Sequence, residues 1–160
     1  MDAIDKVIAQ WANEKPTMNT GPMAIMGRLL RIAKHLECDI SALHKQHDLK
    51  MGEFDVLSTL RRSGAPHKLT PSELMNSMML TSGAMTNRLD KLESKGLIIR
   101  EHSKEDRRSV MISLTENGFV LIDVLIEEHA ALQENLFSAL DEKQQQQISL
   151  LLKQTLSGFE

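Results

Sequence analysis

Apolar side chains recur three and four positions apart along most of the chain, which is the spacing of an amphipathic helix. Near the amino terminus the pattern includes Ile4, Val7, Ile8 and Trp11, and it ends before Pro16. Four later stretches repeat it, so most of the chain is expected to be α-helical. Outside the central segment, the expected helices cover residues 2–14, 22–47, 51–62, 116–136 and 142–156.

The pattern changes between residues 70 and 96, where two short helices are expected on either side of a break. Thr70 can serve as an N-cap, Pro71 suits the first helical position, and Glu73 completes a capping box. The second helix is expected to begin near residue 81 and to end before Gly96, which suits the left-handed position after a helix. Its inward-facing residues are Met85, Leu89 and Leu92.

Two β-like runs follow, over residues 97–102 and 109–114, and a charged turn over residues 103–108 joins them. Two short helices and a basic hairpin are the plan of a winged helix-turn-helix. In that plan one helix enters the major groove of DNA and the hairpin reaches the neighbouring minor groove. The expected fold class is therefore mainly α with a small β wing.

We expect one domain with three kinds of part. Residues 1–15 form an additional N-terminal helix, residues 51–115 form the winged helix-turn-helix, and residues 22–50 and 116–160 supply dimerisation helices. Because the central unit is compact by itself, the apolar helical faces at both ends lack a partner within one chain. A homodimer would cover them, and its two-fold symmetry would place two recognition helices about one turn apart on palindromic DNA.

The net charge of −3 is unexpected for a DNA-binding protein, but the charge is segregated along the chain. Residues 116–160 hold two lysines against eight carboxylates, whereas residues 51–115 hold ten basic and eight acidic side chains. The acidic part thus lies outside the expected DNA-binding unit, and the negative net charge of the chain does not exclude binding to nucleic acid. It does argue against a structural DNA-bending protein, which tends to be basic throughout.

The composition argues against several other classes of protein. The single cysteine, Cys38, cannot form an internal disulfide and fits a reducing cytoplasm. No apolar run approaches the roughly 18 residues of a membrane span. The six histidines are scattered, and neither a nucleophile elbow nor a phosphate-binding loop occurs. We therefore expect no metal, no cofactor and no enzymatic activity.

Three motifs resemble those of the MarR family of transcriptional regulators. They are the run from Ser82 to Ile98, then Asp106-Arg107-Arg108-Ser109, and then Leu114-Thr115-Glu116-Asn117-Gly118. The resemblance covers about residues 25–157. It implies an obligate homodimeric regulator in the bacterial cytoplasm, associated with the nucleoid, whose affinity for palindromic promoter DNA is changed by a small ligand. Repression is the expected direction of regulation.

The DNA-contacting residues are expected in the second helix of the motif and in the wing. Hydroxyl groups suit phosphate contacts, while amide and guanidinium groups can recognise base edges. The candidates are Thr81, Ser82, Thr86, Asn87 and Arg88 in the helix, and Lys104, Arg107 and Arg108 in the wing. The family resemblance implies that one wing arginine enters the minor groove and that Asp106 braces the hairpin.

A narrower resemblance concerns the urate-responsive PecS/UrtR branch of the family. The additional N-terminal helix, the motif Gly52-Glu53-Phe54-Asp55-Val56-Leu57 and the run from Leu80 to Arg88 carry it. It implies ligand-binding roles for Trp11, Asp55, Arg88 and Arg100. An indole can stack on a purine, a carboxylate can accept its N–H groups, and guanidinium groups can pair with its anionic form. Urate or a related purine is the expected effector, and its recruitment of Arg88 is expected to lower DNA affinity.

Two alternatives remain open for the signal. The regulator could respond to a phenolic or other small aromatic compound, or to an oxidant through Cys38. Glu37 and Asp39 flank Cys38, and neighbouring carboxylates disfavour the reactive thiolate. A structural thiol is therefore the favoured interpretation of Cys38.

Overall fold

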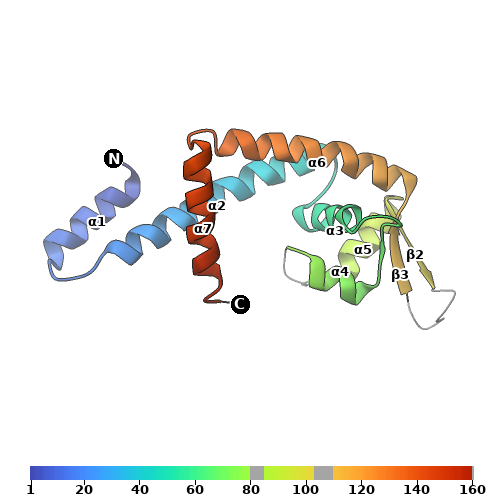
Figure 1. The fold of residues 1–160 in the computed structure, drawn as a ribbon, viewed down its shortest axis with the longest axis horizontal. Coiled ribbons are helices and arrows are strands. Elements are labelled where there is room, and N and C mark those ends of the chain that lie inside the picture. Colours follow the sequence, from blue (N-terminus) through green and yellow to red (C-terminus); the bar gives the residue numbers. More distant parts are fainter. Residues whose placement is uncertain (80–84, 103–109, 160) are drawn as a thin grey trace. The chain divides into compact units, whose positions relative to one another are not determined.

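The computed structural model describes residues 1–79, 85–102 and 110–159, and it divides into two compact units, Met1–Leu43 and His44–Glu160. The described residues are mostly helical and include a small antiparallel sheet, which confirms the expected fold class (Figure 1). The elements are α1 (Ala3–Glu14), α2 (Gly21–Gln46), α3 (Met51–Arg62), β1 (Lys68–Leu69), α4 (Pro71–Ser77), α5 (Met85–Ser94), β2 (Ile98–His102), β3 (Val110–Leu114), α6 (Glu116–Leu136) and α7 (Glu142–Leu156).

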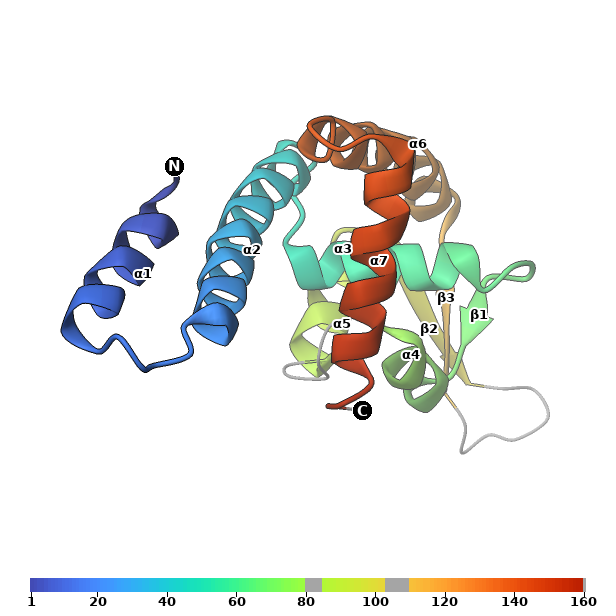
Figure 2. The ribbon, with the colours of Figure 1, turned by 60° about the vertical axis from the view of Figure 1, so that its left-hand side comes forward.

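The first unit consists of α1 and most of α2 (Figure 2), and polar contacts join the two helices. The Asp2 carboxylate caps α1 by accepting the backbone N–H groups of Ile4 and Asp5. The Arg28 guanidinium of α2 pairs with both acids, at 2.9 Å from Asp2 and 2.5 Å from Asp5. No residue of α1 is buried, and beside these ion pairs the Ile4 side chain packs against α2 at Gly27.

In the second unit, α3 is the central helix. Every residue from Glu53 to Leu60 is buried, although four acidic or hydroxyl side chains interrupt the apolar pattern there. Helices α4, α5 and α6 each contact α3, and α4 and α5 lie beside it in Figure 2. The fully buried apolar side chains of this core are Val56, Leu57, Leu60, Leu74, Leu92, Ile98, Ile112, Ile122 and Leu125.

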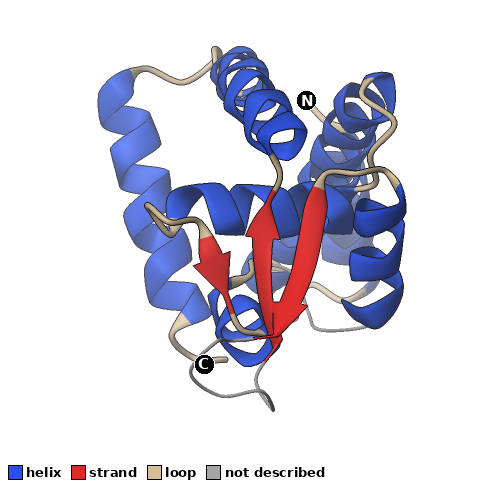
Figure 3. Cartoon of the chain, turned by 90° about the vertical axis from the view of Figure 1, so that its right-hand side faces the viewer, coloured by secondary structure: helices blue, strands red, loops and turns tan. Residues whose placement is uncertain are grey.

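The sheet has the order β1-β3-β2, with β3 in the middle and both pairings antiparallel (Figure 3). Strands β2 and β3 are the expected wing hairpin, with Ile99 opposite Ser113. Strand β1 was not expected from the sequence, because two residues are too few to display an alternating pattern. It pairs Lys68 with Ser113 and so attaches the segment before α4 to the base of the wing.

The local signals at helix ends are confirmed. Thr70 and Glu73 form the expected capping box of α4. Thr115 accepts the Gly118 N–H at 3.0 Å to begin α6, and Asp141 accepts the Gln144 N–H at 2.8 Å to begin α7. Gly96 has a φ of +68°, the left-handed conformation expected after α5.

No helix within the described residues is both long enough and apolar enough to cross a membrane. In the same residues, no three histidine, cysteine, aspartate or glutamate side chains gather in a way that could hold a metal ion.

Candidate functional site

Helix α5 has the two faces that a recognition helix requires. Met85, Leu89 and Leu92 are buried, as the spacing predicted, and they hold the helix in the second unit. The predicted DNA-contacting residues Thr86 and Asn87 are exposed. Lys91 is also exposed and lies one turn beyond Asn87, so it belongs with these candidates. We had not predicted it, although its i+4 spacing from Asn87 was visible in the sequence.

Arg88 is held against the protein. Its side chain passes so close to Gly52 of α3 that a Cβ atom there would lie 2.7 Å from the Arg88 Cζ. The residue is partly buried, unlike Thr86 and Asn87. In this arrangement Arg88 packs on α3 and does not belong to the exposed face of α5. Its predicted roles toward DNA and ligand both require it to leave or extend from this position.

Asp55 lies on α3 one turn beyond Gly52 and is 5% exposed. Its carboxylate accepts the Met79 N–H at 3.4 Å, which connects α3 to the segment that precedes the recognition helix. Two of the four predicted ligand-binding residues thus lie on one face of α3: Asp55 belongs to it, and the Arg88 side chain packs one turn earlier, at Gly52. A ligand that bound the Asp55 carboxylate would compete with its hydrogen bond to Met79, in the segment that precedes the recognition helix.

Arg100, a third predicted ligand residue, lies on β2 and pairs with two carboxylates of α5. Its guanidinium is 2.6 Å from Glu93 and 2.6 Å from Asp90. The hydrogen bond from Arg100 holds the pKa of Glu93 below its usual value, and the same two carboxylates raise the pKa of Arg100. These pairs attach the wing strand to the recognition helix.

A second ionic contact holds the end of α5. Lys95, directly after the helix, lies 3.0 Å from the Glu53 carboxylate of α3 and also contacts Asp48. Burial lowers the pKa of Lys95, but the hydrogen bonds to Glu53 and Asp48 outweigh it, and the net pKa is raised. Because Glu53 is only 2% exposed, its carboxylate needs partners, and it has the Lys95 ammonium and the Lys50 N–H at 3.2 Å.

The remaining predicted site residues are placed elsewhere. Trp11, the fourth ligand candidate, lies on α1 in the first unit and is 38% exposed. Cys38 is exposed on α2. The other predicted DNA contacts and the predicted bracing residue lie outside the described residues, and they remain predictions: Thr81, Ser82, Lys104, Asp106, Arg107 and Arg108.

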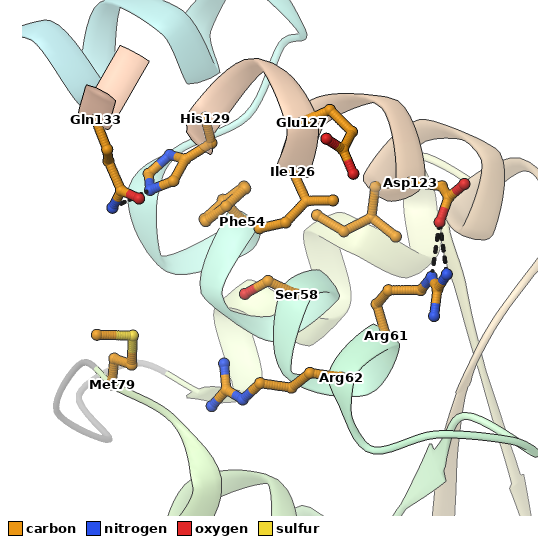
Figure 4. A pocket seen from close by; sticks show the side chains of 11 residues that line it. Phe54, Ser58, Arg61, Arg62, Met79, Asp123, Ile126, Glu127, His129 and Gln133 are labelled. Atoms are coloured by element: carbon orange, nitrogen blue, oxygen red, sulfur yellow. Dashed lines mark hydrogen bonds and ion pairs between the residues drawn. The ribbon is translucent and has the colours of Figure 1, made fainter. Parts of the chain in front are cut away.

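The second unit contains a hollow of about 470 Å³ between α3, α6 and Met79 (Figure 4). Its wall combines aromatic and apolar side chains with two arginines. Arg61 is engaged by Asp123 at 2.7 Å, and Arg62 donates to the Ser77 carbonyl. None of the four predicted ligand residues lines it. The lining residues are Phe54, Ser58, Arg61, Arg62, Met79, Ile122, Asp123, Ile126, Glu127, His129 and Gln133.

One wall of this hollow is an aromatic stack that spacing in the sequence did not indicate. Phe54 stacks on His44 with ring centroids 4.0 Å apart and on His129 at 4.7 Å. The two histidines hydrogen-bond to each other at 3.2 Å. Burial, together with the neighbouring His129 and His47, lowers the pKa of His44 to about 4, and burial also lowers that of His129.

These features define a class of protein. A short capped helix, a second helix with an exposed polar face and a three-stranded sheet attached to it form a winged helix-turn-helix. A sequence profile of the MarR family matches residues 49–110, which contain the helix-turn-helix and β2. The chain belongs to the MarR family of transcriptional regulators.

Named relatives and solved structures agree with that assignment. The chain is 36% identical over 149 residues to the HTH-type transcriptional regulator PecS of Dickeya dadantii, covering 93% of this chain and 90% of that protein. It resembles a MarR variant from Escherichia coli in complex with operator DNA, with a TM-score of 0.72, 25% identity and coverage of 88% and 99% of the two chains. A MepR–DNA complex from S. aureus gives a TM-score of 0.72 at 25% identity, covering 82% and 96%.

Proposed function

We propose that this regulator binds palindromic promoter DNA as a homodimer, acts mainly as a repressor, and releases the DNA when urate or a related purine binds. The observation that carries the DNA-binding part is helix α5, which buries three apolar residues and exposes Thr86, Asn87 and Lys91. An amide and an ammonium group on an exposed helix face suit base edges and phosphates, respectively.

The exposed apolar surface of the terminal helices supports a homodimer. Helix α7 has no buried residue, and its Leu150, Leu151 and Leu156 are each more than half exposed. Helix α2 exposes Ile25 and Leu30 to a similar degree. Surface of this kind marks a protein–protein contact, and an isologous pair would cover both copies of it. A dimer also provides the two recognition helices that a palindrome requires.

The purine part of the proposal depends on Asp55, Arg88, Arg100 and Trp11. Asp55 is a nearly buried acceptor, and the Arg88 side chain packs against the same face of α3, so an N–H-rich anion could engage both. Asp55 contacts the segment before the recognition helix, Arg100 pairs with two carboxylates of that helix, and Arg88 lies on it. A purine that bound these side chains in place of their present contacts would bias α5 toward a placement with lower DNA affinity. Such a difference between two placements is the requirement for allosteric control.

The hollow beside Phe54 and His129 favours a second candidate effector, a small aromatic acid. Its volume of about 470 Å³ is within the range of small-molecule sites. The ring faces offer stacking and Arg62 offers a cation, while Met79, which contributes to the lining, belongs to the segment that precedes α5 in the sequence. Oxidant sensing through Cys38 is the remaining alternative, and it has only the exposure of that thiol in its favour.

The test uses the single tryptophan as a probe, because Trp11 fluorescence reports on ligand binding without a label. Urate, xanthine and salicylate would be titrated into the wild type, Asp55→Asn and a hollow-filling variant, Ser58→Met. A purine effector in the proposed site predicts saturable urate quenching that is lost in Asp55→Asn and kept in Ser58→Met. The reverse pattern, or saturation by salicylate alone, would replace the purine site with the hollow.

A further inference from the structure

Three residues on one face of α3 contact parts of the helix-turn-helix. Gly52, Asp55 and Arg62 are spaced i, i+3 and i+10, which places them on the same side of a helix. Each meets a different part of the motif. Gly52 meets the Arg88 side chain, Asp55 accepts the Met79 N–H, and Arg62 donates to the Ser77 carbonyl. This face of α3 therefore contacts both the recognition helix and the segment that precedes it.

Gly52 is the one of these three positions where α3 presents no side chain. A Cβ atom at Gly52 would lie 2.7 Å from the Arg88 Cζ and 3.0 Å from its Cδ, and it would also collide with the Nε. Glycine is a poor residue inside a helix, and Gly52 does not have the positive φ that would require one. Its local conformation therefore does not call for glycine, whereas the close approach of Arg88 does.

A methyl group at residue 52 would displace Arg88 and leave the fold in place. The colliding atoms belong to the far end of a flexible side chain. The rest of α5 has independent attachments. Its Leu89 and Leu92 are buried in the core, and Lys95, two turns from Arg88, is paired with Glu53 at 3.0 Å. The guanidinium is therefore the group that moves.

We propose that Gly52 is a positioning residue for operator recognition. By leaving room for the Arg88 side chain against α3, it sets the position from which that cation can extend toward DNA next to the exposed Thr86 and Asn87. Operator affinity then depends on residue 52, which is itself on a buried helix and not on the exposed face of α5. This inference concerns DNA recognition and is independent of which ligand the regulator senses.

A double-mutant cycle on full-length protein tests it, with Gly52→Ala, Arg88→Ala and the double variant. Affinity for operator and for scrambled DNA would be measured by anisotropy at low salt, where non-specific binding keeps weakened variants measurable. Gly52→Ala is expected to weaken operator binding roughly tenfold, the usual cost of one disturbed base contact. Its melting temperature is expected to equal or exceed that of wild type, because alanine favours the helix.

Comparing the effect of Gly52→Ala in the wild type with its effect in Arg88→Ala separates a positioning role from a general structural role. With Arg88 truncated there is nothing to displace, so the double variant should match Arg88→Ala within about twofold in operator affinity. The Arg88 Nε–H resonance, assigned by its loss in Arg88→Ala, should shift in Gly52→Ala. An unshifted resonance, an operator affinity for Gly52→Ala within about twofold of wild type, or an equal loss in both backgrounds would each overturn the proposal.

Discussion

Gly118, the third residue of α6, packs directly on the backbone of the wing. A Cβ atom there would collide with the Leu97 carbonyl oxygen and lie 2.8 Å from its carbon. The same carbonyl accepts the Thr115 N–H at 3.1 Å, so it cannot move aside without loosening the start of α6. Unlike the flexible arginine at Gly52, the obstacle here is backbone, and the fold itself must absorb the strain.

Gly118→Ala should therefore lower the free energy of unfolding by about 2 to 3 kcal/mol, as overpacked core positions do. Urea denaturation would measure the loss. Gly158→Ala is the matched control, because its nearest neighbour, the Thr155 carbonyl, lies at an ordinary contact distance of 3.4 Å. Equal stability of the two variants would show that the corner between Leu97 and α6 is not tightly packed.

At the scale of elements, the His44–Phe54–His129 stack joins the end of α2, α3 and α6 in the second unit. His44 is 1% exposed and its pKa is lowered to about 4, so the folded protein favours the neutral imidazole. The unfolded chain binds the proton near pH 6.5. The stabilisation is thus complete above that pH and is lost as the pH falls toward 4.

We expect the free energy of unfolding to fall by about 2 kcal/mol between pH 7 and pH 5 on account of this histidine. The hydrogen-bonded carboxylates with lowered pKa values, such as Glu73 and Glu93, act at lower pH, whereas His129, whose pKa burial also lowers, adds to the loss in the same direction. Denaturation curves at both pH values, for wild type and His44→Leu, would measure the effect. A pH dependence that is the same in His44→Leu would assign it to other groups.

The exposed face of α5 makes a second prediction at this scale. Asn87→Ala should cost about 1 to 3 kcal/mol of operator binding with little effect on scrambled DNA, because an amide discriminates between bases. Lys91→Ala should weaken both DNAs alike and reduce the salt dependence of binding, because an ammonium contacts phosphates. Anisotropy titrations at several salt concentrations separate the two. If Asn87→Ala weakened both DNAs alike and Lys91→Ala weakened only operator binding, α5 would not enter the groove with this face.

The sequence allowed most helices and the wing to be predicted because caps, periodicity and turn glycines are local signals. Thr70, Asp141 and Gly96 act as their spacing indicated. The stack of His44 on His129 could not be predicted, since the two residues are 85 positions apart and neither has a motif around it. The same holds for the pairing of Arg100 with α5 and for the hollow beside Met79. Each depends on how helices pack, which no single segment specifies.

At the scale of the whole molecule, the dimer is the part of the account that surface composition supports most clearly. Leu151→Glu would place a charge within the exposed apolar surface of α7, where Leu151 is 57% exposed. It should convert the protein to monomers and abolish operator binding while leaving the helix content of the chain intact. Sedimentation velocity and circular dichroism would measure both. A dimer that survives this charge would mean that other helices form the interface.

The most direct test of the account is the affinity of the purified regulator for the promoter DNA upstream of its own gene, measured by anisotropy with and without urate. We predict tight, salt-sensitive binding that urate weakens roughly tenfold or more, the usual range of allosteric coupling. Tight binding that urate leaves unchanged would contradict the purine response and shift attention to the hollow beside Phe54. Binding no tighter than that to scrambled DNA would contradict regulation of its own promoter.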